Sequence, residues 1–88
     1  MSVYVDPMFP CACSRKWRYD SACHLVGDSV AELHSFASIL GLKRSWFQNS
    51  LLPHYDLTVN KRRQAVVLGA IELDVKTFIQ KARKQKND

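Results

Sequence analysis

Two short apolar runs, residues 3–5 and 22–26, are each followed by residues that favour turns. This pattern predicts two short strands. The fifteen residues between them, 7–21, contain two prolines and two cysteines and follow no regular apolar spacing. We therefore predict a loop there, at the upper limit of loop length for a compact domain.

The apolar residues that follow recur at helical spacing. Ser29 and Glu32 form a capping box, the Ser-x-x-Glu signature of a helix start. Gly41 stands where a left-handed residue commonly ends a helix. The predicted helix buries a stripe of Val30, Leu33, Ala37 and Leu40.

Two more helices are predicted near the C-terminus. Thr58 caps a helix over residues 59–68 that ends at Gly69, and Asp74 caps a third. The third helix has its apolar stripe at Val75, Phe78, Ile79 and Ala82. Between the first and second helices, Trp46 is expected to begin an extended segment that helps close the core, and residues 53–57 form a loop or short strand.

These elements predict an α+β fold in the order β-β-α-(β)-α-α. Residues 1–80 form a single globular domain, and residues 81–88 form a basic tail that continues the last helix. The expected core consists of Val3, Val5, Leu25, Leu33, Ala37, Leu40, Trp46, Leu57, Val66, Leu68, Val75 and Phe78.

Composition narrows the class of protein. The first ten residues lack the basic start and apolar run of a signal peptide, and no stretch is apolar enough to span a bilayer. We therefore expect a cytoplasmic protein that is not bound to a membrane. The formal charge is +5, and residues 81–88 hold four basic residues and one acidic residue, so much of it lies in the tail. Such a tail gives weak, salt-sensitive contact with nucleic acid at most.

The three cysteines do not predict a strong metal site. An odd number argues against a closed set of disulfides and for a reducing compartment. Cys11, Cys13, Cys23 and His24 amount to four zinc ligands, but their spacing differs from the two separated pairs of most zinc sites. No metal or cofactor is assigned from them.

Several stretches together resemble the family called domain of unknown function 4031, short proteins of bacteria and their phages. They are residues 3–6 (VYVD), 23–25 (CHL), 32–34 (ELH), 46–48 (WFQ), 54–57 (HYDL), 61–62 (KR) and 69–70 (GA). The resemblance covers residues 2–80. It implies a bacterial or phage origin and no assigned activity, and the loop around Cys11 and Cys13 differs from the family's pattern.

Polar residues gather near the predicted strand ends and the second helix start. His24, His54 and Asp56 are the catalytic candidates, because a histidine and a carboxylate can bind a divalent metal or act as an acid–base pair. The spacing of His54 and Asp56 puts both on one face of an extended segment. Candidates for binding a phosphate or another ligand group are Asp6, Thr58, Lys61 and Arg62, since two cations in a first helical turn oppose the helix dipole unless an anion binds there. Each of these residues also has an ordinary structural interpretation, as a cap, a backbone partner or a solvated charge.

Four functions follow from these residues. The first is a module that binds a phosphorylated ligand, either a nucleotide or a nucleic-acid end. The second is a small metal-dependent or acid–base hydrolase or phosphoesterase using His54 and Asp56. The third is a protein-interaction module, such as an inhibitor of a host factor.

The fourth is a helix-turn-helix DNA binder built from residues 65–83, which the five residues between Gly69 and the start of the third helix disfavour. The basic aromatic run of residues 15–19 either stacks on a nucleobase or anchors a loop through Trp17. His34, in the middle of the first helix, is expected to be packed or exposed rather than a ligand. The ligand, the oligomeric state and the biological process do not follow from the sequence.

Overall fold

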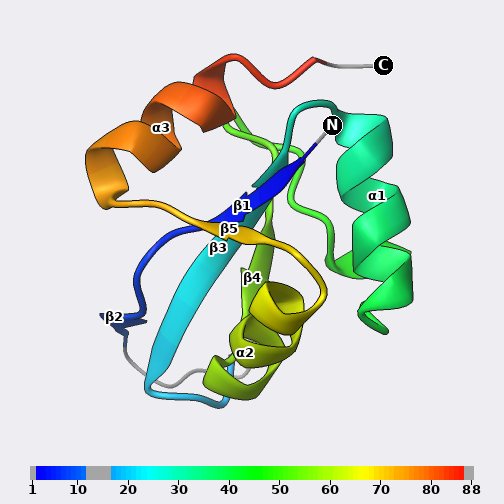
Figure 1. Ribbon diagram of the computed structural model, residues 1–88. Helices are drawn as coiled ribbons and strands as arrows, with labels where there is room; N and C mark the ends of the chain where they lie inside the picture. Colours follow the sequence, from blue (N-terminus) through cyan, green and yellow to red (C-terminus); the bar gives the residue numbers. More distant parts are fainter. Residues whose placement is uncertain (1, 12–16, 87–88) are drawn as a thin grey trace.

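The computed structural model describes residues 2–11 and 17–86 as one mixed sheet with helices on both faces (Figure 1). It confirms the α+β class. The strands are β1 (Val3–Val5), β2 (Phe9–Pro10), β3 (Ser21–Gly27), β4 (Tyr55–Leu57) and β5 (Ile71–Glu72). The helices are α1 (Val30–Ile39), α2 (Val59–Val67), α3 (Val75–Arg83) and the 3-10 turn η1 (Arg44–Trp46).

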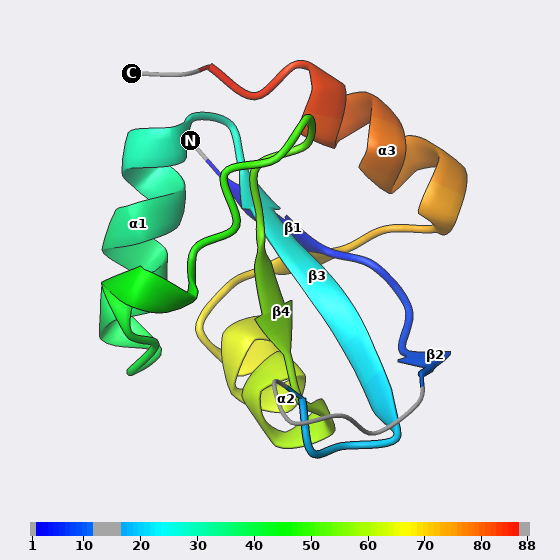
Figure 2. The same cartoon turned by 180° about the vertical axis from the view of Figure 1, so that it is seen from behind.

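Strand β3 is the centre of the sheet. Its residue Leu25 pairs with Val5 of β1 and with Tyr55 of β4, both antiparallel, so these two strands flank β3. Strand β5 runs parallel to β1 and forms an edge, while β2 pairs with the start of β3. Seen from behind, β3 and β4 lie side by side in front of β1 (Figure 2).

The alternation of side chains along the strands divides the core between two faces of the sheet. One face packs Val5, Leu25 and Leu57 against α1 and α2, where Leu33 and Ala65 are fully buried. The other face packs Tyr4 and Val26 against Phe78 and Ala82 of α3. His24 lies between Cys23 and Leu25, so its side chain belongs to the α3 face.

The three predicted helix starts are confirmed. The side chains of Ser29, Thr58 and Asp74 each accept a hydrogen bond from the backbone N–H three residues later. Gly41 and Gly69 follow α1 and α2 with φ of 86° and 112°, a conformation that other residues rarely adopt. Within the described part of the chain, no helix is long and apolar enough to cross a membrane.

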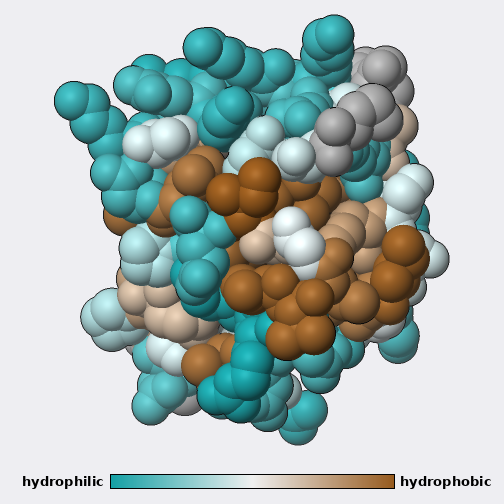
Figure 3. Space-filling model, in the orientation of Figure 1, coloured by the Kyte–Doolittle hydropathy of each residue, from teal (hydrophilic) through white to brown (hydrophobic). Residues whose placement is uncertain are grey.

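Three expected core residues are about half exposed instead: Trp46 (51%), Leu68 (50%) and Val75 (56%). Trp46 ends η1 rather than beginning an extended segment. Residues 71–72 form β5, a strand that the sequence analysis did not predict. Because β5 is an edge strand, Ile71 and its neighbours Val67 and Leu68 remain exposed, and apolar side chains gather on this face of the molecule (Figure 3).

The basic tail continues the last helix only as far as Arg83, where α3 ends. The chain turns back, and Lys86 exchanges backbone hydrogen bonds with Asp28 (3.0 Å) and Val30 (2.7 Å). The side chain of Gln85 accepts from the Gly27 N–H (2.8 Å) and donates to the Pro53 carbonyl (2.7 Å). The tail therefore ties the end of β3 to the segment that leads into β4.

Candidate metal centre

A bulge between β1 and β2 positions the first functional side chain. Val5 pairs with Leu25 and Phe9 with Ala22, so three residues, 6–8, lie opposite two residues of β3. Pro7 has no N–H to donate there, and the regular ladder is interrupted. The Asp6 carboxylate compensates, because its Oδ1 accepts the backbone N–H of His24 at 2.6 Å.

The same carboxylate holds the His24 ring. Asp6 Oδ2 lies 2.7 Å from His24 Nδ1, and the Asp6 side chain is only 8% exposed. The ring stacks on Phe9, with centroids 5.0 Å apart, and lies beside Phe78. A carboxylate accepts hydrogen bonds, so Nδ1 is the protonated nitrogen and Nε2 is free to bind a metal when the ring is neutral.

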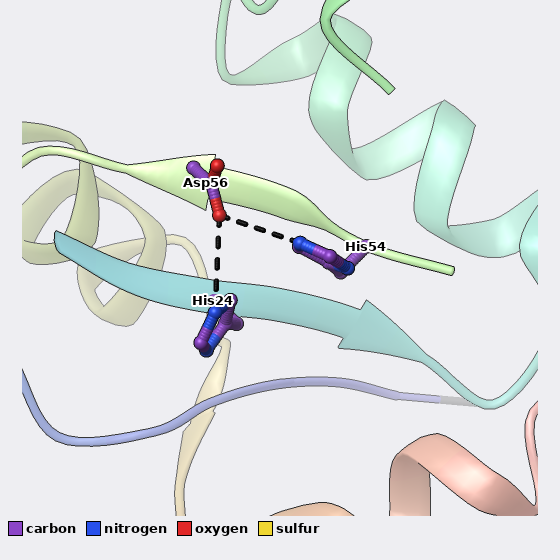
Figure 4. A group of neighbouring side chains, drawn as sticks. All are labelled: His24, His54 and Asp56. Carbon is purple, nitrogen blue, oxygen red and sulfur yellow. Dashed lines mark ion pairs between the residues drawn. The ribbon is translucent and has the colours of Figure 1, made fainter. Parts of the chain in front are cut away.

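His54 and Asp56 come from the neighbouring strand. Asp56 pairs with His24 in the β3–β4 register, and the two-residue period puts His54 on the same face. His54 Nδ1 lies 2.7 Å from the Leu52 carbonyl, which fixes this ring in the same tautomer as His24. Asp56 Oδ1 lies 3.4 Å from His54 Nε2 and 3.9 Å from His24 Nε2, so three side chains converge (Figure 4).

Gln48 orients the carboxylate of this group. Its backbone pairs with that of His54 through two hydrogen bonds of 2.9 and 3.2 Å. Its side-chain amide donates to Asp56 Oδ2, which leaves Oδ1 turned toward the two imidazoles. The sequence analysis did not select Gln48 as a site residue, although it lies in one of the stretches that carry the family resemblance.

The three side chains fit a single divalent ion. One ligand atom from each of His24, His54 and Asp56 lies within 4.8 Å of the others, and this is the candidate metal group found among residues 2–11 and 17–86. Tetrahedral zinc with bonds of about 2.0–2.1 Å separates its ligand atoms by about 3.4 Å, so small side-chain movements suffice. Metal-bound histidines almost always donate their other N–H to a carboxylate or carbonyl, as both rings do here.

Neither of the two cysteines in the described part of the chain is a ligand of this centre. Cys23 is fully buried in the cluster that packs against α1 and α2, on the face of the sheet opposite to His24. Burial raises the pKa of its thiol to about 12, whereas zinc binds the thiolate. Cys11 is a partly exposed free thiol, and Cys13 lies outside the described residues. The four-ligand set of Cys11, Cys13, Cys23 and His24 is therefore not formed.

His54 and Asp56 stabilise each other's charged form. Burial disfavours protonated His54, but the hydrogen bonds to Asp56 and Leu52 outweigh it and raise the pKa of the imidazole above 6.5. Burial likewise disfavours ionised Asp56, yet His54 and Gln48 lower the pKa of the carboxyl below 3.8. A divalent ion would compete directly with the proton on His54.

This coupling predicts a pH dependence. In the metal-free protein, protonated His54 adds to the free energy of unfolding below pH 6.5. This stabilisation is lost as the pH rises through the raised pKa of His54. Ionised Asp56 adds to the free energy of unfolding above pH 3.8, and this stabilisation is lost as the pH falls through the lowered pKa of Asp56. We expect Asp56→Asn to lower the free energy of unfolding more at about pH 5 than at about pH 8 in urea titrations. An equal loss at both values would contradict the coupling.

The proposed phosphate ligands do not all join this group. Lys61 Nζ donates to the Leu40 carbonyl at 2.8 Å. Arg62 Nε donates to the Asp6 backbone carbonyl at 2.9 Å, and Arg62 Nη1 donates to the Glu72 carboxylate at 2.8 Å. The Arg62 guanidinium is therefore already held by these two groups. The Asp6 carboxylate is occupied by His24 and would repel a phosphate. Thr58 caps α2 and, with Lys61, lines a groove next to Asp56.

Two other expectations are resolved by the packing. Helices α2 and α3 lie on opposite faces of the sheet and are joined through β5, so they do not form a helix-turn-helix. His34 is packed, as expected, with its Nδ1 2.8 Å from the Tyr55 hydroxyl and its ring against Phe47. In the basic aromatic run, residues 15 and 16 lie outside the described residues, and Trp17 donates to the Ser21 carbonyl.

Comparison with known proteins gives one match. Residues 3–85 match the family described as protein of unknown function (DUF4031). This chain belongs to the DUF4031 family. No curated protein and no solved structure matches it. Membership in DUF4031 therefore confirms the resemblance noted in the sequence and brings no activity with it, so a function must be argued from the side chains themselves.

Proposed function

We propose that this chain is a small hydrolase that uses one divalent transition-metal ion held by His24, His54 and Asp56. The observation that carries the proposal is the convergence of two imidazoles and a carboxylate whose orientations are already fixed. Asp6 and Leu52 hold the two Nδ1 atoms, and Gln48 holds the outer oxygen of Asp56. Fixed ligands reduce the cost of ordering the site when a metal binds.

The number and exposure of the ligands favour catalysis over a structural role. Structural zinc sites have four protein ligands, whereas catalytic sites have three and leave a position for water or substrate. The side chains of His24, His54 and Asp56 are 33%, 17% and 28% exposed. Solvent therefore reaches the side of the group that the protein leaves open.

The proposed reaction is the hydrolysis of a phosphate ester by water. A zinc ion held by these residues would lower the pKa of a bound water to about 7 and so supply hydroxide at neutral pH. The water oxygen forms a bond to phosphorus, the bond from phosphorus to the leaving oxygen breaks, and a proton ends on that oxygen. The protein's own part is to hold one ligand atom each of His24, His54 and Asp56 directed at one point.

Hydrolysis of bis(p-nitrophenyl) phosphate tests the proposal. We expect turnover with added Zn²⁺ or Mn²⁺, loss of turnover with a chelator, and loss in His54→Ala because one of three ligands is removed. The matched control is His34→Ala, which removes a histidine that is packed against Phe47 and Tyr55 outside the metal centre.

Two results would contradict a metal-dependent hydrolase. One is activity that survives chelation but is lost in His54→Ala, which would indicate acid–base chemistry by the same residues. The other is an equal loss of activity in His34→Ala and His54→Ala at unchanged folding.

A further inference from the structure

A groove of about 760 Å³ adjoins the metal centre. Asp56 and Gln48 line both, so a ligand in the groove lies next to the carboxylate that faces the imidazoles. Its other walls include Trp17, Tyr19, Trp46 and Lys61. Small-molecule sites typically have volumes of about 300–1,000 Å³, so the groove is large enough for a nucleotide.

The walls of the groove present aromatic rings. Tyr19 and Trp46 are large aromatic side chains, yet each is 51% exposed. Trp17 contacts Tyr19 edge-on, with centroids 5.3 Å apart, so the two rings support each other. Lys43 lies 5.7 Å from the centroid of the Trp46 ring. Exposed rings beside a cation are the arrangement with which proteins stack nucleobases.

A cation, Lys61, also lines the groove. The Lys61 ammonium gives one hydrogen bond to the Leu40 carbonyl, and an ammonium has three N–H donors. Its side chain is partly exposed on the wall that also contains Thr58 and Asp56. Lys61 therefore offers N–H donors to an anionic group in the groove, which Asp56 of the metal centre also lines.

We propose that the groove binds a nucleoside phosphate, with the base stacked on Trp46 and Tyr19 and the phosphate between Lys61 and the metal centre. This assignment rests on the proposed function, because it names the substrate class of the same site. The shared chemistry is a nucleoside monophosphate unit, supplied either as a free nucleotide or as the end of a single strand.

Calorimetric titration of the metal-free protein with adenosine 5′-monophosphate tests the assignment, with ribose 5-phosphate and phenyl phosphate as comparison ligands. We expect the nucleotide to bind most tightly of the three. Trp46→Ala should weaken nucleotide binding by about 5- to 150-fold, the range for loss of a stacking ring, and leave ribose 5-phosphate unchanged. Lys61→Gln should weaken both, whereas the exposed Lys76→Gln is the matched control and should weaken neither.

A 5′-phosphorylated single-stranded pentanucleotide distinguishes the two sources. Tighter binding than the mononucleotide would support a nucleic-acid end, and equal binding would support a free nucleotide. The inference is overturned if ribose 5-phosphate or phenyl phosphate binds as tightly as the nucleotide, or if Trp46→Ala has no effect. Zn²⁺ binding is measured separately. If the protein binds the nucleotide but not Zn²⁺, the hydrolase proposal alone is overturned. If it binds Zn²⁺ but not the nucleotide, this inference alone is overturned.

Discussion

Zn²⁺ is expected to raise the melting temperature of the metal-free protein by about 10 °C or more. A ligand at 100 times its Kd stabilises the folded state by about 2.7 kcal/mol, and each kcal/mol shifts the melting temperature of a domain of this size by about 4–8 °C. The three ligand atoms converge only in the fold, because they come from two strands and the segment before the second. Scanning calorimetry with and without Zn²⁺ measures the shift.

The variant His54→Ala should abolish this stabilisation, since a site with two ligands binds far more weakly than one with three. Its melting temperature without Zn²⁺ should stay close to that of the wild type at pH 8, where the ion pair with Asp56 contributes least. The control His34→Ala should keep the Zn²⁺ shift, even where losing its contact with Tyr55 lowers the starting temperature. An unchanged shift in His54→Ala would contradict the assignment of this ligand.

Asp6→Asn is expected to lower Zn²⁺ affinity by about 10- to 100-fold, the usual effect of losing a partner of a metal-bound histidine. The amide oxygen can still accept the His24 backbone N–H. Its NH₂ group then faces His24 Nδ1, which must become an acceptor, so the ring proton moves to Nε2 and blocks the metal. Calorimetric titration measures the affinity, and ¹⁵N chemical shifts of the His24 ring report the tautomer.

Asp6→Ala separates this effect from a loss of stability. Alanine leaves the His24 backbone N–H without its partner in the bulge, which should cost about 1–3 kcal/mol of unfolding free energy. Asp6→Asn should cost less, because that hydrogen bond is kept. If Asp6→Asn binds Zn²⁺ like the wild type and keeps the wild-type tautomer, Asp6 does not position the ring.

Local signals in the sequence predicted most of the fold. Each cap is a hydrogen bond between residues three apart, and each apolar stripe repeats within two helical turns. Ser29, Thr58 and Asp74 therefore identify the starts of their helices without tertiary information. Strand β5 has only two residues and no apolar alternation, and its pairing with β1 depends on the distant Val5. Trp46 was assigned to the core on hydrophobicity alone, which does not reveal which faces remain uncovered.

The sequence indicated the convergence of His24, His54 and Asp56 more clearly than the positions of Lys61 and Arg62. The spacing of His54 and Asp56 fixes their common face, and the register of β3 with β4 adds His24. For Lys61 and Arg62 the sequence predicts a position on α2 but not where their long side chains point. In the structure they donate hydrogen bonds to the backbone carbonyls of Leu40 and Asp6. Gln48 was missed because its role depends on a single bridge to His54.

X-ray absorption spectroscopy of the Zn²⁺-loaded protein tests the metal centre most directly. The ligand set of His24, His54 and Asp56 predicts only nitrogen and oxygen neighbours at about 2.0–2.2 Å, with the outer-shell scattering of two imidazoles. Sulfur at about 2.3 Å would assign the ion to cysteine thiolates. That result, or the absence of imidazole scattering, would contradict the account.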